Sequence, residues 1–183
     1  MRVWLLLVLS LTAFNCQAED CVRTPSMPIG LKLEHYRSPT PACVPNGLTL
    51  TTAELQTLIK NDQPILIDVM AVFLREDEGF PATWLVNEVH ESLPASIWLP
   101  SVGYGVLEPK IETWFRAQLA KLTKQNFEQA LVFYCVADCW MSWNTVQRVR
   151  EYGYTRVYWY KEGIDGWKEA GLPLVKTEPQ AFN

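Results

Sequence analysis

Two cysteines at the end of a hydrophobic run carry the chemistry for which this chain is best equipped. In the stretch LVFYCVADCWMSWN, residues 131 to 144, Cys135 ends a strand-like run and Cys139 follows four residues later, before a helix-like segment. A helix N-terminus offers unpaired N–H groups and a partial positive charge, and both stabilise a thiolate, the reactive form of cysteine. We therefore predict that Cys135 and Cys139 are catalytic.

Several kinds of chemistry fit this spacing. The pair is compatible with a dithiol that cycles to a disulfide, with a sulfur carrier, and with a permanent disulfide that only holds the loop. Cu(I) binding is a further alternative, because this soft ion takes thiolates and the chain has two histidines, His35 and His90, that offer a third ligand. A structural zinc site needs more ligands than the loop supplies, and covalent haem is excluded because no Cys-x-x-Cys-His occurs. We assign no metal site and no cofactor.

Three more residues of this loop are candidates for the same site. Asp138 lies between the cysteines, where its carboxylate serves either as a local proton acceptor or as a cap for the following helix. Trp140 and Trp143 come directly after the loop, and we predict that they bind a substrate or partner at the rim of the crevice. Core packing is the alternative for both, and it explains Trp143 better.

The first twenty residues, MRVWLLLVLSLTAFNCQAED, have the pattern of a secretory signal peptide. One early positive charge, Arg2, precedes an apolar run, and the CQA tripeptide offers a cleavage site after Ala18. The apolar run is shorter than the ~20 residues that a membrane-spanning helix needs. We therefore expect residues 1–18 to be removed and the mature protein to be exported without a membrane attachment.

Export determines what the remaining cysteines are expected to do. Four cysteines follow the cleavage site, and an even number in an oxidising compartment favours disulfides. The simplest of three connectivities pairs Cys21 with Cys43 and Cys135 with Cys139. The Cys21–Cys43 bond would tie down a proline-rich, extended arm, residues 19–47, that has little core of its own.

The charge of the chain argues against two classes of partner. The formal net charge is −4, and no segment is rich in lysine or arginine. Nucleic acid demands clustered cations to meet its phosphates, and an anionic membrane surface makes a similar demand. We expect neither as a partner.

The order of predicted elements indicates an α/β fold. TTAE, residues 51–54, is a capping box that opens a short helix, and PILIDV, residues 64–69, is a continuous apolar run typical of a buried parallel strand. The elements expected after an irregular stretch, residues 70–96, are a strand at 96–100, a helix from Pro109, a strand at 131–134, a helix at 144–152 and a strand at 156–160. This alternation predicts an open parallel sheet flanked by helices.

Several strings along the chain resemble a rhodanese-like domain. IDV (67–69), PASIWLP (94–100), FYC (133–135) and GYTRVYWYKEGIDGWKEAGLPL (153–174) follow the order of that family. We assign residues 48–176 to such a domain and residues 177–183 to a C-terminal tail. The resemblance matches Cys135 to the family's catalytic cysteine and Asp68 to its first-strand aspartate, which is either structural or part of the binding site.

A narrower resemblance implies a location and a partner. VGYGVLEP, YCVADCWMSWN and VYWYKEGIDGW are similar to the exported rhodanese-like proteins that are associated with PQQ-dependent catabolism and named for a CXXCW motif. That resemblance implies a periplasmic protein that assists alcohol oxidation, with a PQQ-dependent dehydrogenase or its cytochrome as partner. PQQ enters through the resemblance alone, and the spacing here, Cys-x3-Cys-Trp, is one residue longer than the motif.

The chain also departs from the rhodanese pattern. Trp140 and Met70 stand where the family usually has arginines, so the loop is expected to lack the cation that draws thiosulfate, and ordinary thiosulfate sulfurtransferase activity is not expected. Cys139 is an added thiol, which could resolve a persulfide on Cys135 or shuttle two electrons with it. The other class of function is a non-catalytic binding module that holds a periplasmic partner in its tryptophan-rich crevice.

Overall fold

The computed structural model describes residues 21–25 and 27–183. The expected signal peptide, residues 1–18, lies outside these residues. Within the described part of the chain, no helix combines the length and the apolar composition that crossing a membrane requires.

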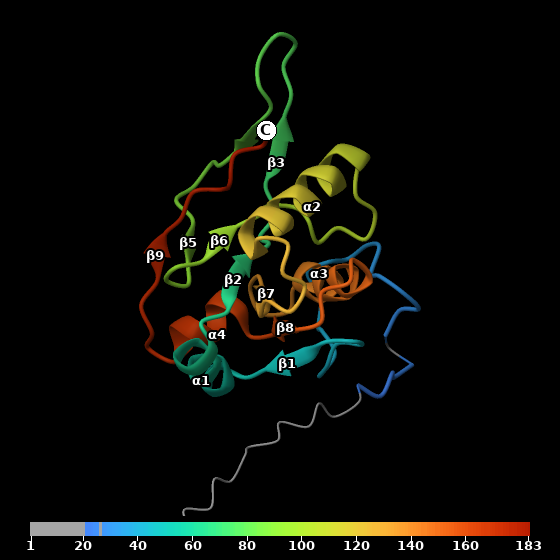
Figure 1. Cartoon of the computed structure of the whole chain (residues 1–183), viewed down its shortest axis with the longest axis vertical. Coiled ribbons are helices and arrows are strands. Elements are labelled where there is room, and N and C mark those ends of the chain that lie inside the picture. Colours follow the sequence, from blue (N-terminus) through green and yellow to red (C-terminus); the bar gives the residue numbers. More distant parts are fainter. Residues whose placement is uncertain (1–20, 26) are drawn as a thin grey trace, which may run out of the picture.

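The predicted open parallel sheet is confirmed (Figure 1). It has five strands in the order β1-β8-β7-β2-β6, and every neighbouring pair is parallel. The strands are β1 (Leu48–Leu50), β2 (Ile65–Asp68), β6 (Ile97–Trp98), β7 (Leu131–Tyr134) and β8 (Val157–Tyr160).

Helices cover both faces of this sheet. They are α1 (Thr52–Asp62), α2 (Pro109–Thr123), α3 (Trp140–Glu151) and α4 (Gly163–Glu169). Because side chains alternate along a strand, Phe133 packs into the cluster formed with α2 and α3, while its neighbour Tyr134 packs into the cluster formed with α1 and α4. Both faces are therefore buried, which explains why β2 and β7 read as continuous apolar runs.

Local sequence signals start two of the helices. The Thr51 hydroxyl accepts the Glu54 N–H, and the Glu54 carboxylate accepts the Thr51 N–H at 2.8 Å, so the predicted capping box is present. Pro109 occupies the first position of α2, as expected. Helix α3 begins at Trp140, four residues before the predicted start at Asn144, because the first ten residues of this helix are all buried and leave no periodic pattern to mark its beginning.

The stretch 70–96, expected to be irregular, contains short strands. An antiparallel pair, β3 (Phe73–Arg75) and β4 (Thr83–Leu85), forms a hairpin that projects from the domain (Figure 1). Strand β5 (Glu91–Ser92) pairs with β9 (Val175–Lys176) near the C-terminus. Strands of two or three residues are too short to show an alternating pattern, which is why the sequence did not reveal them.

The C-terminal tail covers the β6 edge of the main sheet. Pro179 forms a parallel bridge with Trp98, and the Gln180 N–H donates to the Trp98 carbonyl at 2.9 Å. Phe182 lies against the rings of Trp84 and Trp114. The tail therefore protects an edge that would otherwise present unpaired backbone groups.

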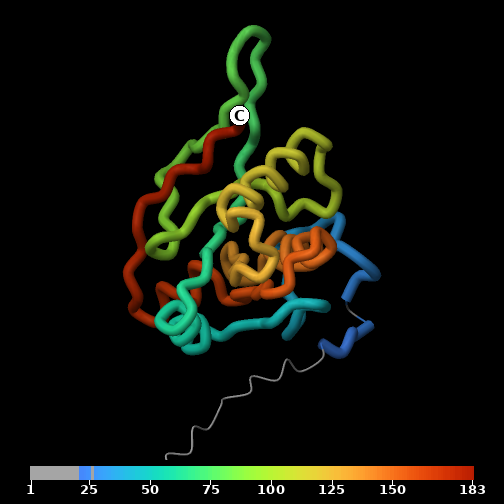
Figure 2. Tube along the Cα trace, in the orientation of Figure 1, coloured from blue at the N-terminus to red at the C-terminus, as the bar shows by residue number. Residues whose placement is uncertain are grey.

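The N-terminal arm is packed against the domain rather than extended away from it. Figure 2 shows the arm, in blue, beside α3. A disulfide joins Cys21 to Cys43, with 5.6 Å between their Cα atoms. The buried amide of Asn144 accepts the Lys32 N–H and donates to the Lys32 carbonyl, both at 2.8 Å, and the Trp143 indole donates to the Cys43 carbonyl. Contacts with α3 therefore hold the arm at Lys32 and at Cys43.

Candidate functional site

The two cysteines lie at the two ends of the loop between β7 and α3. Cys135 follows the last residue of β7, and Cys139 is the N-cap of α3. Both are free thiols, with exposed fractions of 0 and 3%. Their side chains share a hydrogen bond instead of forming the expected second disulfide. The structure thus presents a reduced, closely spaced dithiol.

The first turn of α4 fixes the shape of this loop. The Asp165 carboxylate accepts the Ala137 N–H at 2.9 Å, and the Ile164 N–H donates to the Cys135 carbonyl at 2.9 Å. Gly163 has a φ of 57°, and a Cβ there would collide with the Cys135 carbonyl. Asp165 could not be identified from the sequence, because nothing in the chain marks its contact with a loop that lies 28 residues away.

Electrostatics distinguish the two thiols. The hydrogen bond from Cys135, the N–H of Met141 and the guanidinium of Arg37 together lower the pKa of Cys139 to about 7, against the opposing effect of burial. The hydrogen bond to Cys139 raises the pKa of Cys135 well above its usual value, helped by burial and by the negative charges of Cys139 and Asp68. The first thiolate therefore forms on Cys139, at the helix N-terminus, and not on Cys135.

The N-terminal arm supplies the cation that the loop was expected to lack. Arg37 forms an antiparallel backbone bridge with Cys139, and its side chain hydrogen-bonds both the Cys139 sulfur and, at 3.1 Å, the Ala137 carbonyl. The positions of Trp140 and Met70 suggested a loop without a nearby positive charge. That expectation was wrong, because the arginine comes from a segment that precedes the domain by sequence but touches the loop in space.

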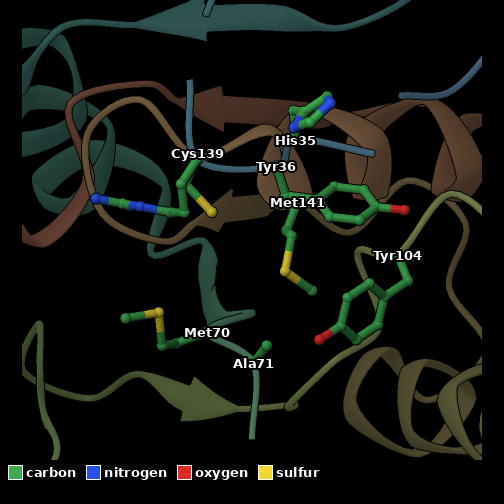
Figure 3. A pocket seen from close by; sticks show the side chains of 8 residues that line it. His35, Tyr36, Met70, Ala71, Tyr104, Cys139 and Met141 are labelled. Carbon is green, nitrogen blue, oxygen red and sulfur yellow. The ribbon is translucent and has the colours of Figure 1, made fainter. Parts of the chain in front are cut away.

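A hollow leads to Cys139 (Figure 3). Its volume is about 540 Å³, and it is lined by His35, Tyr36, Arg37, Met70, Ala71, Tyr104, Cys139 and Met141. The rings of Tyr36 and Tyr104 meet edge to face at 5.3 Å, and burial raises the pKa of Tyr104. Cys139 lines the hollow, whereas Cys135 is buried behind it. A small reactant therefore meets Cys139 first.

Asp138 points to the arm rather than toward a reacting group. Its carboxylate accepts the Thr40 N–H at 3.1 Å and lies 3.3 Å from the Thr40 hydroxyl. Its φ of 52° is left-handed, which directs the tight turn between the two cysteines. The structure therefore gives Asp138 a role in positioning the arm and the loop.

The two tryptophans are not free to bind a partner at a rim. Trp140 is buried, its indole N–H donates to the Ser38 hydroxyl at 2.9 Å, and the Lys32 ammonium lies 4.9 Å from its ring centroid. Trp143 is fully buried and packs edge to face on Trp140. The arm of this same chain covers both rings, so the predicted binding face is occupied.

The carboxylate of Asp68 also makes its hydrogen bonds within the chain. One carboxylate oxygen accepts the Met70 N–H at 2.9 Å, and the other hydrogen-bonds His90 at 2.7 Å and Ser92 at 2.5 Å. The His90 ring stacks on Trp98, 4.0 Å between centroids. Asp68 thus holds the peptide of Met70, which lies against the cysteines, and does not itself face the hollow.

Comparisons with known proteins agree with this architecture. The family model described as rhodanese-like domain matches residues 51–170. Thiosulfate sulfurtransferase GlpE of Actinobacillus pleuropneumoniae is 38% identical over 53 residues, which cover 29% of this chain and 48% of the relative. The chain therefore spans about half the length of the curated relatives it matches.

One of the solved structures that align with this chain supports the same fold. Thiosulfate sulfurtransferase from Pseudomonas aeruginosa aligns with a TM-score of 0.50 and 17% identity, over 75% of this chain and 22% of that one. The polysulfide-sulfur transferase homodimer from Wolinella succinogenes aligns with a TM-score of 0.43 and 20% identity, over 71% of this chain and 79% of that one. Since the family model covers well over half of the sequence, the chain belongs to the rhodanese-like domain family.

Proposed function

We propose that the protein carries out thiol redox or sulfur-transfer chemistry with Cys139 as the attacking thiolate and Cys135 as the resolving thiol. The observation that carries this proposal is the division of roles within the pair. Cys139 lines the hollow, caps α3 and lies beside Arg37, whereas Cys135 is buried behind it with a raised pKa. This order reverses the sequence-based hypothesis of a persulfide on Cys135.

Two balanced steps follow for a donor R–S–SH that carries sulfane sulfur. The Cys139 thiolate attacks the outer sulfur, the S–S bond of the donor breaks, and a Cys139 persulfide forms as the thiolate R–S⁻ leaves. Cys135 then attacks the Cys139 sulfur, so a Cys135–Cys139 disulfide forms and the outer sulfur leaves as hydrogen sulfide with the proton of Cys135. The outer sulfur gains two electrons, which the two thiols lose. A dithiol reductant returns the pair to its starting state.

The loop is less suited to a sulfur oxyanion such as thiosulfate. Backbone N–H groups are the groups that would hold the anion, and two of them are already bonded within the chain. The Ala137 N–H donates to the Asp165 carboxylate, and the Trp140 N–H donates to the Tyr36 carbonyl at 2.9 Å. We therefore propose a persulfide or polysulfide donor.

The proposal includes a periplasmic location and a role beside PQQ-dependent alcohol oxidation. A signal-peptide pattern at residues 1–18 and the bonded pair Cys21–Cys43 support export to an oxidising compartment. The strings around the cysteine loop support a partnership with a PQQ-dependent dehydrogenase or its cytochrome. The sulfur-transfer activity in the curated relative's name supports the chemistry.

A non-catalytic binding module is the second candidate function. The observation that favours it is the burial of both thiols under an arm that also covers Trp140. In such a module the dithiol would stay unreacted, and the arm together with α3 would offer the binding surface.

Exposure of the reduced protein to polysulfide under anaerobic conditions separates the two functions. We expect release of about one hydrogen sulfide per chain and the appearance of a Cys135–Cys139 disulfide, seen by intact mass after alkylation. Protein whose free thiols were alkylated beforehand is the control and should release none. If the protein that was not alkylated keeps two free thiols after exposure to polysulfide and releases no sulfide, only the binding module remains.

A further inference from the structure

We infer that Cys135, Cys139, Met70 and Met141 together form a Cu(I) site. The Cys135 sulfur contacts both the Cys139 sulfur and the Met70 sulfur, and Met70, Cys139 and Met141 line the hollow in front of it. Figure 3 shows Cys139, Met70 and Met141 around the hollow, with their side chains at its wall. Soft thiolate and thioether ligands select Cu(I). The inference does not rest on the proposed sulfur transfer, because metal binding needs no sulfur donor.

Met70 is held in the position of a ligand. Its backbone N–H donates to the Asp68 carboxylate at 2.9 Å, and its carbonyl accepts the Trp98 indole N–H at 2.8 Å. Its sulfur lies 3.6 Å from the Cys135 sulfur. Sulfur ligands at a bond length of ~2.3 Å around one metal lie roughly 4 Å apart, so this pair is already spaced for a shared ion.

Met141 is held from the opposite side. It is buried in the first turn of α3, and its backbone N–H bonds the Cys139 sulfur. The backbone of Gly103 lies so close that a Cβ there would collide with Met141. The Asn144 amide in turn donates to the Gly103 carbonyl at 2.9 Å. These contacts hold the backbone of Met141 beside the cysteine loop, where its side chain lines the hollow.

The remaining groups suit a monovalent soft ion better than zinc. Among the residues that the structure describes, no cluster of three or more His, Cys, Asp or Glu side chains could hold a metal, so zinc lacks the harder ligands that complete its usual sites. Two thiolates with Cu(I) carry one net negative charge, and the Arg37 guanidinium bonded to Cys139 offsets it. His90 is hydrogen-bonded to Asp68, and His35 is an exposed residue of the arm. The further ligands that the sequence suggested to be histidine are therefore thioethers in this site.

The test is an anaerobic titration of the reduced mature protein with Cu(I), in competition with bicinchoninate. We expect one Cu(I) per chain, and Met70→Leu and Met141→Leu should each weaken binding by at least about tenfold. Leucine nearly preserves the volume of methionine, and thermal unfolding of each variant checks that the fold is kept. Met27→Leu is the matched control, because Met27 is also buried but lies in the arm, outside the hollow, and should bind as the unmodified chain does.

Three results would overturn the inference. They are no Cu(I) retained against the competitor, binding by both methionine variants as tight as that of the unmodified chain, or displacement of Cu(I) by equimolar Zn(II). X-ray absorption at the copper edge gives a second readout, since three or more sulfur neighbours are expected and two would mean that the thiolates alone bind. The titration contains no sulfur donor. Its failure therefore leaves the proposed sulfur chemistry standing, and a failure to release sulfide leaves the metal site standing.

Discussion

Arg37 of the N-terminal arm lies across an antiparallel backbone bridge from Cys139, the N-cap of α3. The guanidinium hydrogen-bonds the Cys139 sulfur and the Ala137 carbonyl, so it joins the arm to the loop and lowers the pKa of the thiol. A segment outside the region matched by the family model thus contributes to the site, in addition to covering it.

Replacing Arg37 should raise the pKa of Cys139. Because that pKa is lowered to about 7, the unmodified chain gains its first thiolate as pH rises through about 7 and holds a thiol below it. Arg37→Gln removes the positive charge, so the midpoint should move to higher pH. Ultraviolet absorbance of the thiolate, followed against pH, measures it. Arg75→Gln is the control, because this exposed arginine pairs with Asp77 and should leave the midpoint unchanged. If the midpoint is also unchanged in Arg37→Gln, the arm does not have the role given to it here.

Gly163 should be more sensitive to substitution than a glycine of similar backbone conformation. Gly163→Ala meets both a φ of 57° and the backbone of Cys135, whereas Gly171→Ala meets a φ of 70° with nothing within 4 Å. The Gly171 variant should lose about 1–2 kcal/mol of unfolding free energy through backbone strain alone. The Gly163 variant should lose more, because the cysteine loop must also shift. Urea unfolding of both proteins measures the difference, and equal losses would mean that the turn does not constrain the loop.

Asn144 should control access to Cys139 by holding the arm. Asn144→Ala leaves the Lys32 N–H and carbonyl without their partner, which should cost about 1–3 kcal/mol and loosen the arm. The rate at which a small alkylating reagent reaches Cys139 should then rise. Asn61→Ala, at an exposed position of α1, is the control and should alkylate at the rate of the unmodified chain. If the rate in Asn144→Ala also stays unchanged, the arm does not gate the hollow.

The fold was largely predictable because its signals are local. The apolar run ending at Asp68, the capping box of Thr51 and Glu54, and Pro109 at the start of α2 each report on their own segment of chain. Their alternation was enough to predict the parallel sheet and to place a cysteine at its carboxyl edge.

The details of the site were not predictable in the same way. Arg37, from the arm, bonds Cys139, and Met70, just after β2, contacts Cys135. Nothing in the spacing of either residue points to the loop. The same limit made Trp140 appear available to a substrate or partner, whereas its indole donates to Ser38 of the arm; the contact of Asp138 with Thr40 was equally hidden. Contacts between segments so far apart follow from packing, which periodicity and local motifs do not encode.

The location of the first transferred sulfur tests the central claim most directly. Reduced Cys135→Ser and Cys139→Ser proteins are treated with polysulfide, excess reagent is removed, and peptide mass spectrometry locates the added sulfur after alkylation. Cys135→Ser should carry one extra sulfur atom on Cys139 and release no sulfide, whereas Cys139→Ser should stay unmodified. A stable extra sulfur on Cys135 in the Cys139→Ser protein, with Cys139 unmodified in the other, would contradict the account and return the nucleophile's role to Cys135.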